Sequence, residues 1–430
     1  MLAAVLLAAA PSASALASVT PKPASGTPAL APTGTTEQIR QLVQCGQTMY
    51  AVGSFTSIQR NGTTYARNNI FSFGAVAPYA VTTWNPNVNG VVNSIAFSGT
   101  SCATAYIGGK FSSVHGTAAT DIAAISTSTG AVQTGFSHSA NGQVETLLGY
   151  QGHLLVGGYF TSINGSSADK YMASLSPVTG KDDGFIRLNI SGNYQYCNPS
   201  GTKCASPNPT RVYNQQLSHG GSLDLVEGDF TSVGGRSRQQ IFMLNLAGTT
   251  AAVTGWTSSA FNQHCTFGEP FYVRAASWSP DDATVYVGTT GFHLADWNGQ
   301  FPLTGLCDVA AAFPASQAGV GTKWINYTGC DSLYSTAADS TTAYFGGHER
   351  WSQNPSGCDF AGPGAISAPG MEGLSPANGL LTFNPTRSRG LGADDMLLTK
   401  AGLWIASDNF DGSDKCAGVS GHAGICFLPY

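Results

Sequence analysis

The sequence predicts an all-β protein, a seven-bladed β-propeller built from four-stranded antiparallel blades. Three observations lead to this class. A Gly-containing phrase recurs seven times, every copy lies in the same order of short β-type segments, and Gly-rich turns separate those segments. One four-stranded repeat cannot bury both of its faces alone. Radial stacking of neighbouring copies would cover them, as in a propeller.

The recurring phrase is clearest in the first four copies and weaker in the last three. The clear copies are YAVGSFTSI (50–58), YIGGKFSSV (106–114), LVGGYFTSI (155–163) and LVEGDFTSV (225–233). The weaker ones are VYVGTTGFH (285–293), YFGGHERW (344–351) and LWIASDNF (403–410). Aligned on the Gly or its substitute, the copies have anchors at Gly53, Gly109, Gly158, Gly228, Gly288, Gly347 and Ser407, about 59 residues apart on average.

The third copy illustrates the four strands expected in a blade. QVETLLGY, HLLVGGYF, KYMASLSP and DDGFIRLNI are rich in β-branched and aromatic residues and are separated by turns. The Phe after the Gly pair should fill the wedge between blades (Phe55, Phe111, Phe160 and Phe230). The Ser/Thr pair that follows should cap its own turn through hydroxyl groups. The phrase G-x-F-[TS]-S is therefore interpreted as structural and not as a sugar site.

The VGGxFTSI…TG phrase resembles the delta-60 repeat of secreted bacterial β-propellers, and the repeats cover nearly everything after residue 36. The resemblance is specific in copies one to four and degenerate in five to seven. It implies a propeller of non-enzymatic or unassigned role, similar to subunits found beside lectin modules and in secreted toxin assemblies. The motif contains no catalytic residue that could be transferred to this chain.

The chain divides into a signal peptide (1–17), an N-terminal segment (18–36) and the propeller (37–430). The apolar run of residues 2–10 is too short to span a bilayer, and Ala15-Leu16-Ala17 fits a cleavage site. In the seventh copy, AGICFLPY is the third strand and no fourth follows. We therefore expect residues 24–33 of the N-terminal segment to pair with the last blade as an outer strand and close the ring.

Composition and charge argue against two classes of partner. Only 10% of the residues are charged and the formal net charge is −5, without a long Lys/Arg run. Nucleic acid and an anionic membrane surface both require basic patches, so neither is an expected partner. The composition suits a secreted, extracellular protein.

Ten cysteines in an exported chain indicate disulfide bonds, and no C-x-x-C pair points to zinc or redox chemistry. Sequence alone does not fix the connectivity. The simplest hypothesis joins neighbours: Cys45–Cys102, Cys197–Cys204, Cys265–Cys307, Cys330–Cys358 and Cys416–Cys426.

Four long insertions suggest which face binds a ligand. Segments 191–212, 258–271 and 305–330 are predicted to connect blades, and 351–378 to join a second to a third strand, which places all four on one face. Aromatic residues of these insertions suit a sugar ring or a protein partner. They are Tyr194, Tyr196, Phe267, Phe271, Tyr272, Trp324, Tyr327, Trp351 and Phe360. The alternative is that they pack beneath their own loops.

The segment GHER is the largest departure from the repeat. It places His348, Glu349 and Arg350 where other copies have Phe-Thr-Ser. These residues either line the binding site or form a local ion pair.

Motifs for catalysis and metal binding are weak, and no cofactor is expected. Glycoside hydrolysis needs two carboxylates, but no pairing stands out among Glu269, Asp308, Asp331, Glu349 and Glu372. Asp408, Asp411 and Asp414 around Gly412 would be a weak Ca²⁺ site, with a polar turn as the alternative.

The sequence thus predicts a secreted, non-catalytic recognition or scaffold module that binds a glycan or a protein partner. A lectin-like subunit of an extracellular assembly is one version. The alternatives are a glycan-active hydrolase with its site at the channel mouth and a purely structural cell-envelope protein.

Overall fold

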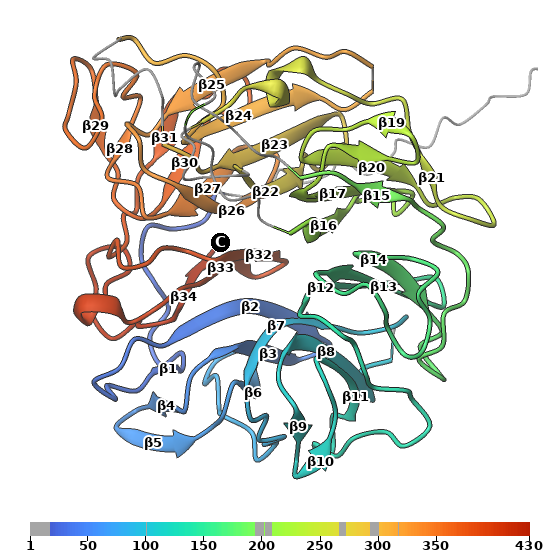
Figure 1. Cartoon of the computed structure of the whole chain (residues 1–430). Coiled ribbons are helices and arrows are strands. Elements are labelled where there is room, and N and C mark those ends of the chain that lie inside the picture. The colour runs from blue at the N-terminus through green and yellow to red at the C-terminus, as the bar shows by residue number, and fades with distance from the viewer. Residues whose placement is uncertain are drawn as a thin grey trace, which may run out of the picture.

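The computed structural model describes residues 18–99, 101–193, 202, 209–265, 272–292, 301–316 and 318–430. The fold is all-β, as predicted, and consists mainly of seven antiparallel sheets in which successive strands pair (Figure 1). Two short 3-10 helices, Ser259–Asn262 and Phe410–Gly412, lie in the described part. No helix there is long and apolar enough to cross a membrane. The predicted signal peptide lies outside the described residues.

The sheets are numbered here 1 to 7 along the chain, and each begins with its first strand. Sheet 1 consists of β2 (Gln38–Cys45), β3 (Thr48–Ser54) and β6 (Ile70–Gly74). Sheet 2 consists of β7 (Val91–Ala96), β8 (Thr104–Lys110) and β11 (Ile122–Ser126). Sheet 3 consists of β12 (Val144–Tyr150), β13 (His153–Gly158) and β14 (Met172–Leu175). Sheets 4 and 5 are β16 (Arg211–Leu217), β17 (Leu223–Asp229), β20 (Ile241–Asn245), β21 (Ala252–Val253); and β22 (Val273–Trp278), β23 (Thr284–Thr289), β24 (Val309–Pro314), β25 (Trp324–Tyr327). Sheets 6 and 7 are β26 (Leu333–Ala338), β27 (Ala343–Gly347), β30 (Glu372–Leu374), β31 (Leu381–Phe383); and β32 (Asp395–Thr399), β33 (Gly402–Ala406), β34 (Ile425–Pro429).

Short strands between second and third strands form accessory hairpins. They are β4 (Ser57–Arg60), β5 (Thr63–Ala66), β9 (Ser113–Val114), β10 (Thr117–Ala118), β18 (Ser232–Val233), β19 (Arg236–Ser237), β28 (Trp351–Ser352) and β29 (Ile366–Ser367). Two further strands, β1 (Ala29–Leu30) and β15 (Ile190–Ser191), pair with β4 and β18.

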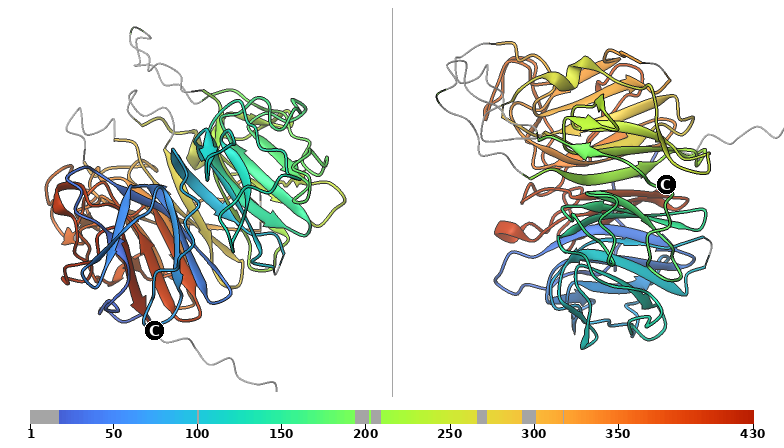
Figure 2. Two further views of the ribbon diagram at one scale, coloured as in Figure 1. Left: turned by 90° about the horizontal axis from the view of Figure 1, so that it is seen from below. Right: turned by 45° about the vertical axis from the view of Figure 1, so that its right-hand side comes forward.

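The first strands of the seven sheets are neighbours in chain order. β2 contacts β7, and the contacts continue through β12, β16, β22 and β26 to β32, which contacts β2. The N-terminal strands accordingly lie beside the C-terminal ones in the ribbon views (Figures 1 and 2). The fourth strand is regular only in sheets 4, 5 and 6. In sheets 1 to 3 it is reduced to single bridges such as Phe73↔Val81.

The N-terminal segment lies along the last sheet, four residues earlier than predicted. The amides of Thr20 and Ala24 donate to the carbonyls of Pro429 and Phe427, at 2.7 and 2.9 Å. Residues 29–30 of the expected segment 24–33 pair instead with β4 of the first accessory hairpin. The segment therefore bridges sheet 7 and sheet 1.

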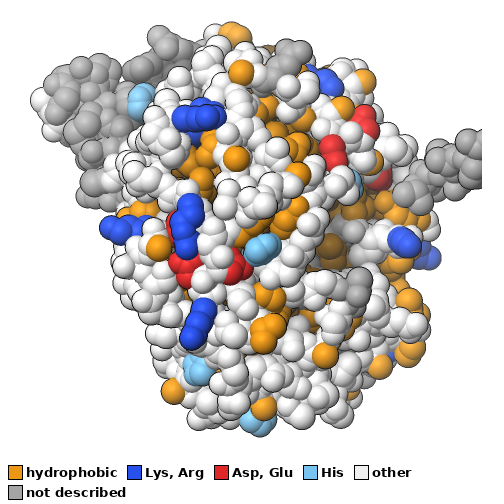
Figure 3. Space-filling model, turned by 90° about the vertical axis from the view of Figure 1, so that its right-hand side faces the viewer, with side chains coloured by type: hydrophobic (Ala, Val, Ile, Leu, Met, Phe, Trp, Pro, Cys, Tyr) orange, Lys and Arg blue, Asp and Glu red, His pale blue; other side chains and the backbone are white. Residues whose placement is uncertain are grey.

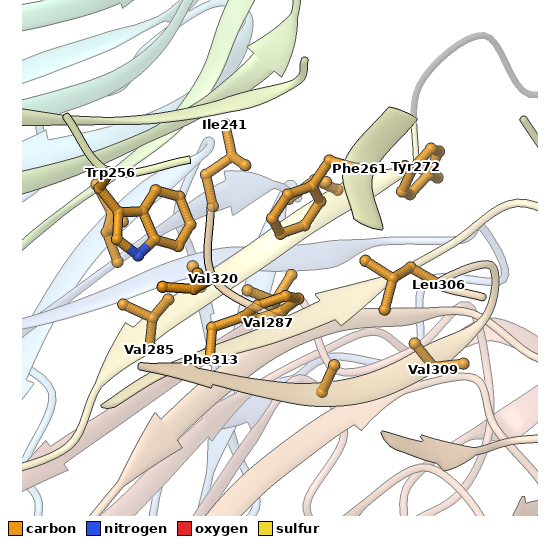
Figure 4. Close-up of a cluster of buried hydrophobic side chains, with 14 of the residues drawn as sticks. Ile241, Trp256, Phe261, Tyr272, Val285, Val287, Leu306, Val309, Phe313 and Val320 are labelled. Atoms are coloured by element: carbon orange, nitrogen blue, oxygen red, sulfur yellow. The ribbon is translucent and has the colours of Figure 1, made fainter. Parts of the chain in front are cut away.

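The hydrophobic core lies between neighbouring sheets. Phe55, Phe111, Phe160 and Phe230 are all buried, which confirms their predicted place in the wedges. Figure 4 shows the wedge between sheets 4 and 5, where Trp256, Phe261 and Phe313 pack together. The face drawn in Figure 3 carries Lys/Arg and Asp/Glu side chains among many neutral polar and apolar ones.

The F-[TS]-S turns are structural, but their caps come from other loops and not from their own hydroxyl groups. Asn89 Oδ1 accepts the amides of Ser112 and Ser113, both at 2.9 Å. Asn141 Oδ1 accepts the amides of Thr161 and Ser162 in the same way. The loop before each of these sheets thus holds its turn in place.

Four of the five predicted disulfides are confirmed: Cys45–Cys102, Cys265–Cys307, Cys330–Cys358 and Cys416–Cys426. Cys197 and Cys204 lie outside the described residues. The second and third bonds each join a connection between sheets to a connection between a second and a third strand. This arrangement agrees with the prediction that these loops share a face.

Two alignments made from the sequence were wrong. Segment 305–330 does not connect blades, because it contains β24 and β25, the third and fourth strands of sheet 5. In the fifth copy the anchor position is Thr289, which pairs with Val273, whereas Gly288 pairs with Ala275 one step further along. The weak match of this copy to the repeat explains both errors.

Candidate functional site

A β-bulge recurs at the same place in the first strands. In sheets 1 to 6 the pairing of the first with the second strand skips one residue. The skipped residues are Arg40, Asn93, Glu145, Tyr213, Arg274 and Tyr334. Asp394 takes this place in sheet 7, where its amide donates to Ala406 at 2.9 Å. Because a bulge re-aims side chains, each sheet presents one long polar side chain off the regular ladder.

The anchor glycines make room for these bulges. A Cβ on Gly109 would lie 2.1 Å from the carbonyl oxygen of Val91, and one on Gly228 would lie 2.1 Å from that of Arg211. Both carbonyls belong to the residue two positions before the skipped one. In these two sheets a larger residue would push the first strand away, whereas sheet 5 forms its bulge with Thr289 at the anchor position.

The skipped residues converge on a polar channel. A cavity of about 200 Å³ is lined by residues from all seven first strands or the residue just before them. Its wall consists of Gln38, Arg40, Gln41, Asn93, Ser94, Glu145, Thr146, Tyr213, Asn214, Gln216, Arg274, Tyr334, Asp394 and Asp395. All of these side chains carry a polar group, in contrast to the apolar wedges between sheets.

A wider cavity of about 500 Å³ forms the mouth of this channel. It shares Gln38, Arg274, Tyr334 and Asp394 with the inner cavity. Its remaining lining comes from the connections on the long-loop face: Thr290, Ser332, His348, Gly390 and Leu391. The channel therefore opens on the face that the long insertions predicted.

Hydrogen bonds link the wall from sheet 1 to sheet 3. Arg40 Nη1 donates to Asn93 Oδ1 at 2.7 Å, and Asn93 Nδ2 donates to Glu145 Oε2 at 2.9 Å. Arg211, which precedes the bulge of sheet 4, lies 3.7 Å from Glu145 Oε1. The side chains of four consecutive sheets are thereby fixed relative to one another.

Guanidinium groups and phenol rings alternate along the next part of the wall. The guanidinium carbon of Arg211 lies 4.6 Å from the ring centre of Tyr159 and 5.1 Å from that of Tyr213. Arg274 lies 4.2 Å from the Tyr213 ring and 5.3 Å from the Tyr334 ring. These cation–π contacts hold the arginine planes in fixed orientations.

Burial shifts the ionisation of the channel carboxyls. It raises the pKa of Asp394 to about 7, which Arg40 and Arg274 partly offset. Burial also raises the pKa of Asp395 to about 6, although the Leu42 amide donates to its carboxylate at 2.8 Å. The pKa of Glu145 is raised for the same reason. The charge of the channel therefore changes near neutral pH.

The GHER segment divides between the site and the interior. His348 lines the mouth, where its Nδ1 lies 2.8 Å from the Tyr334 hydroxyl, and burial lowers its pKa. Arg350 forms the predicted local ion pair, because its Nε and Nη2 donate to Asp331 at 2.8 and 2.7 Å. Glu349 is fully buried and does not reach the channel surface.

Those predicted aromatic residues that the structure describes do not form one exposed surface. Tyr272 and Trp324 are buried in the core, so they do not belong to a binding surface (Figure 4 shows Tyr272). For these two residues the alternative, packing beneath the loops, is correct. Tyr327 and Trp351 are half-buried, and only Phe360 is exposed. Tyr194, Tyr196, Phe267 and Phe271 lie outside the described residues.

The carboxylates considered for hydrolysis are not assembled at the mouth. Asp308, Asp331, Glu349 and Glu372 are buried, and Asp331 is held by Arg350 and Arg389. Glu269 lies outside the described residues. Burial and the nearby Glu372 carboxyl raise the pKa of Glu349.

The weak calcium site is not formed in the described part of the chain, where no three acidic, His or Cys residues gather to hold a metal. Asp408 is buried and accepts the amides of Phe410 and Gly392, at 2.7 and 3.0 Å. Asp414 accepts the amide of Gly421 at 3.2 Å. The polar-turn interpretation fits these bonds.

The fold and the channel define an all-β protein with a polar channel lined by its first strands. No family model matches the chain, and no curated protein matches it. It is similar to a solved structure of hydrazine synthase from Kuenenia stuttgartiensis, with 11% identity, coverage of 86% of this chain and 92% of that chain, and a TM-score of 0.47. It is also similar to the WD40 β-propeller domain of Doa1, with 12% identity, coverage of 89% of this chain and 94% of that chain, and a TM-score of 0.44. The computationally designed Ika8 protein is similar with 9% identity, coverage of 94% of this chain and 100% of that chain, and a TM-score of 0.44.

Proposed function

We propose that this chain is a secreted, seven-bladed β-propeller, closed by its N-terminal segment, that binds a glycan in its channel without catalysis. The cyclic order of contacts among the seven first strands supports the ring. The bonds from Thr20 and Ala24 to β34 support its closure. Four disulfides fit an oxidising compartment outside the cell.

The polar wall of the channel is the observation that carries this proposal. Its lining offers amide and guanidinium donors beside carboxyl and amide acceptors, among them Gln38, Asn93, Arg274 and Asp394. A sugar hydroxyl both donates and accepts hydrogen bonds, so this class of ligand suits the mixed wall. The mouth, at about 500 Å³, has the volume of a small-ligand site.

A hydrolase remains the second candidate because two carboxyls with raised pKa values, Asp394 and Glu145, face the same channel. Glycoside hydrolysis uses such a pair. Glu145, however, is held by Asn93, Gln143 and Arg211, as expected of a structural residue. Cleavage of a bound glycan by the wild type, abolished by Asp394→Asn, would favour the hydrolase.

A protein partner is a further possibility at the rim of the same face. The exposed rings of Phe301 and Phe360 pack edge to face, with centroids 6.1 Å apart, beside the Cys330–Cys358 bond. Co-purification of a partner from culture medium, lost on Phe360→Ser, would support a scaffold role.

A glycan array tests the proposed function. The purified chain is expected to bind a restricted set of glycans, and Leu391→Trp, which narrows the mouth, should abolish that binding. Val178→Trp serves as the control, because it introduces the same indole ring at an exposed position that is far from Leu391 in the sequence. Absence of glycan binding by the wild type, or equal binding by Leu391→Trp, would contradict the proposal.

A further inference from the structure

We propose that the ligand is an acidic sugar whose carboxylate is bound by Arg274, and that Asp394 makes this binding weaker in alkaline than in acidic medium. The inference rests on the proposed function, because it specifies the ligand of the same channel. It follows from where these two residues lie and from how their side chains are held.

Arg274 lies where the inner cavity meets the mouth, since it lines both. Its guanidinium lies against the rings of Tyr213 and Tyr334, and its Nη2 donates to the Tyr213 hydroxyl. A planar guanidinium held in one orientation matches the two oxygens of a carboxylate.

The other two arginines near the channel have different roles. Arg40 donates to Asn93, and Arg211 lies beside Glu145 and donates to the Tyr159 hydroxyl. Both belong to the wall that links sheets 1 to 4. Of these three arginines, Arg274 lines both cavities, Arg40 lines the inner cavity alone and Arg211 lines neither, so Arg274 is placed to meet a ligand at the mouth.

Asp394 lines the same two cavities as Arg274 and controls the charge there. Ionised, it competes with a ligand carboxylate for the positive charge of Arg274, and protonated, it offers a hydroxyl donor instead. Burial brings the pKa of Asp394 to about 7, so this change occurs near neutral pH. The titratable and charged groups that interact with it electrostatically or line the same cavities are Arg40, Arg274, Tyr213, Tyr334, Asp395, Asp408, Arg387, Glu145 and His348.

These groups reinforce the direction of the pH effect. Asp395 also gains its proton in this range, because burial raises its pKa to about 6. The arginines stay charged throughout. As the pH falls from 8 to 5.5, the channel therefore loses negative charge and keeps its positive charge. Its affinity for an anion should rise by about tenfold, the effect of one charge at a few ångströms in a partly buried site.

The experiment compares acidic and neutral glycans on one array at pH 5.5 and pH 8. A panel of uronic-acid-terminated and sialylated glycans is printed beside the corresponding neutral glycans. The wild type is expected to prefer acidic glycans, and to bind them about tenfold better at pH 5.5. Asp394→Asn should bind them with a clearly smaller difference between the two pH values, because of these two carboxyls only Asp395 then changes its charge in this range, and Arg274→Gln should lose them. The exposed Arg236→Gln, on β19, is the control for loss of a positive charge.

The possible outcomes separate this inference from the proposed function. Binding of neutral glycans alone, blocked by Leu391→Trp, would overturn the acidic ligand and leave the channel function intact. Binding of acidic glycans that is independent of pH, or retained in Arg274→Gln, would overturn the roles given to Asp394 and Arg274. Thermal unfolding of each variant shows whether a loss of glycan binding is caused by misfolding. If Arg274→Gln is misfolded, Arg274→Lys is used in its place. The lysine keeps the charge without the fork, so it should bind more weakly than wild type.

Discussion

Buried carboxyl groups are an unusual feature of this protein at the scale of single residues. Asp224, Glu227, Glu349 and Glu372 are completely buried within or beside the sheets. Burial raises the pKa of Glu372 to about 7 and that of Glu227 to about 8, with Asp224 adding to the shift of Glu227. Glu372 and Glu227 are therefore protonated in the folded protein under mildly acidic conditions.

This ionisation makes stability depend on pH. Between pH 4.5 and 7 the folded chain keeps the Glu372 proton while the unfolded chain loses it, so the free energy of unfolding falls as the pH rises. Glu372→Gln cannot ionise and should be more stable than wild type at pH 8, by about 2–3 kcal/mol. Urea unfolding at pH 5 and pH 8 measures this difference. Asp411→Asn, on an exposed turn, serves as the control and should keep the wild-type dependence of the free energy of unfolding on pH. A Glu372→Gln variant with the same pH dependence as wild type would refute the account.

The anchor glycines give a second prediction at this scale. A Cβ on Gly228 would lie 2.1 Å from the Arg211 carbonyl oxygen and 2.8 Å from the Phe230 ring. Gly228→Ala should therefore destabilise the protein by about 1–3 kcal/mol, as overpacking does. Gly255, with no atom within 4 Å of its Cβ position, gives the matched control Gly255→Ala. Chemical denaturation of both variants tests the claim, which fails if they are equally stable.

Single residues also mark the limit of what sequence could predict about the site. The Phe of each clear repeat could be assigned to a wedge because an apolar residue at a fixed place in a repeat must be covered. The residues skipped by the bulges could not, because a bulge depends on the register between two strands. A signal was nevertheless present, since each of these polar side chains stands about 13–16 residues before its anchor.

At the scale of elements, strands and disulfides were predictable and the connections were less so. The strong repeats fixed the second strands, and neighbouring cysteines fixed the bonds that the structure describes. Sheet 5 was misaligned because its third strand, β24, carries Ala residues and its fourth, β25, follows a long connection. The polar lining of the channel was missed because it comes from seven separate sheets that only the folded chain brings together.

The N-terminal segment is the element whose removal is most informative. Val19 and Leu30 are buried, and the amide of Leu30 donates to Ala423 at 2.8 Å, in addition to the bonds of Thr20 and Ala24. Deletion of residues 18–31 uncovers the outer edge of β34 and should speed hydrogen exchange in residues 425–430. Removing only residues 1–17 should not. Exchange mass spectrometry compares the two, and equal protection of β34 would argue against closure by this segment.

At the scale of the whole molecule, the first strands of seven like sheets line one polar cavity. Apolar wedges between neighbouring sheets hold those sheets together. Every side chain that lines the cavity carries a polar group, in contrast to these wedges. This contrast is the reason to place the proposed recognition in the channel and not on the loop surface.

Calorimetric titration of a glycan identified on the array tests that placement most directly, with wild type, Gln38→Trp and Val178→Trp. Gln38 lines both cavities, so the indole in Gln38→Trp fills the passage between them. The account predicts that this variant unfolds at the wild-type temperature but loses at least about tenfold in affinity, or 1.4 kcal/mol, while Val178→Trp binds normally. Wild-type affinity in a folded Gln38→Trp protein would contradict it.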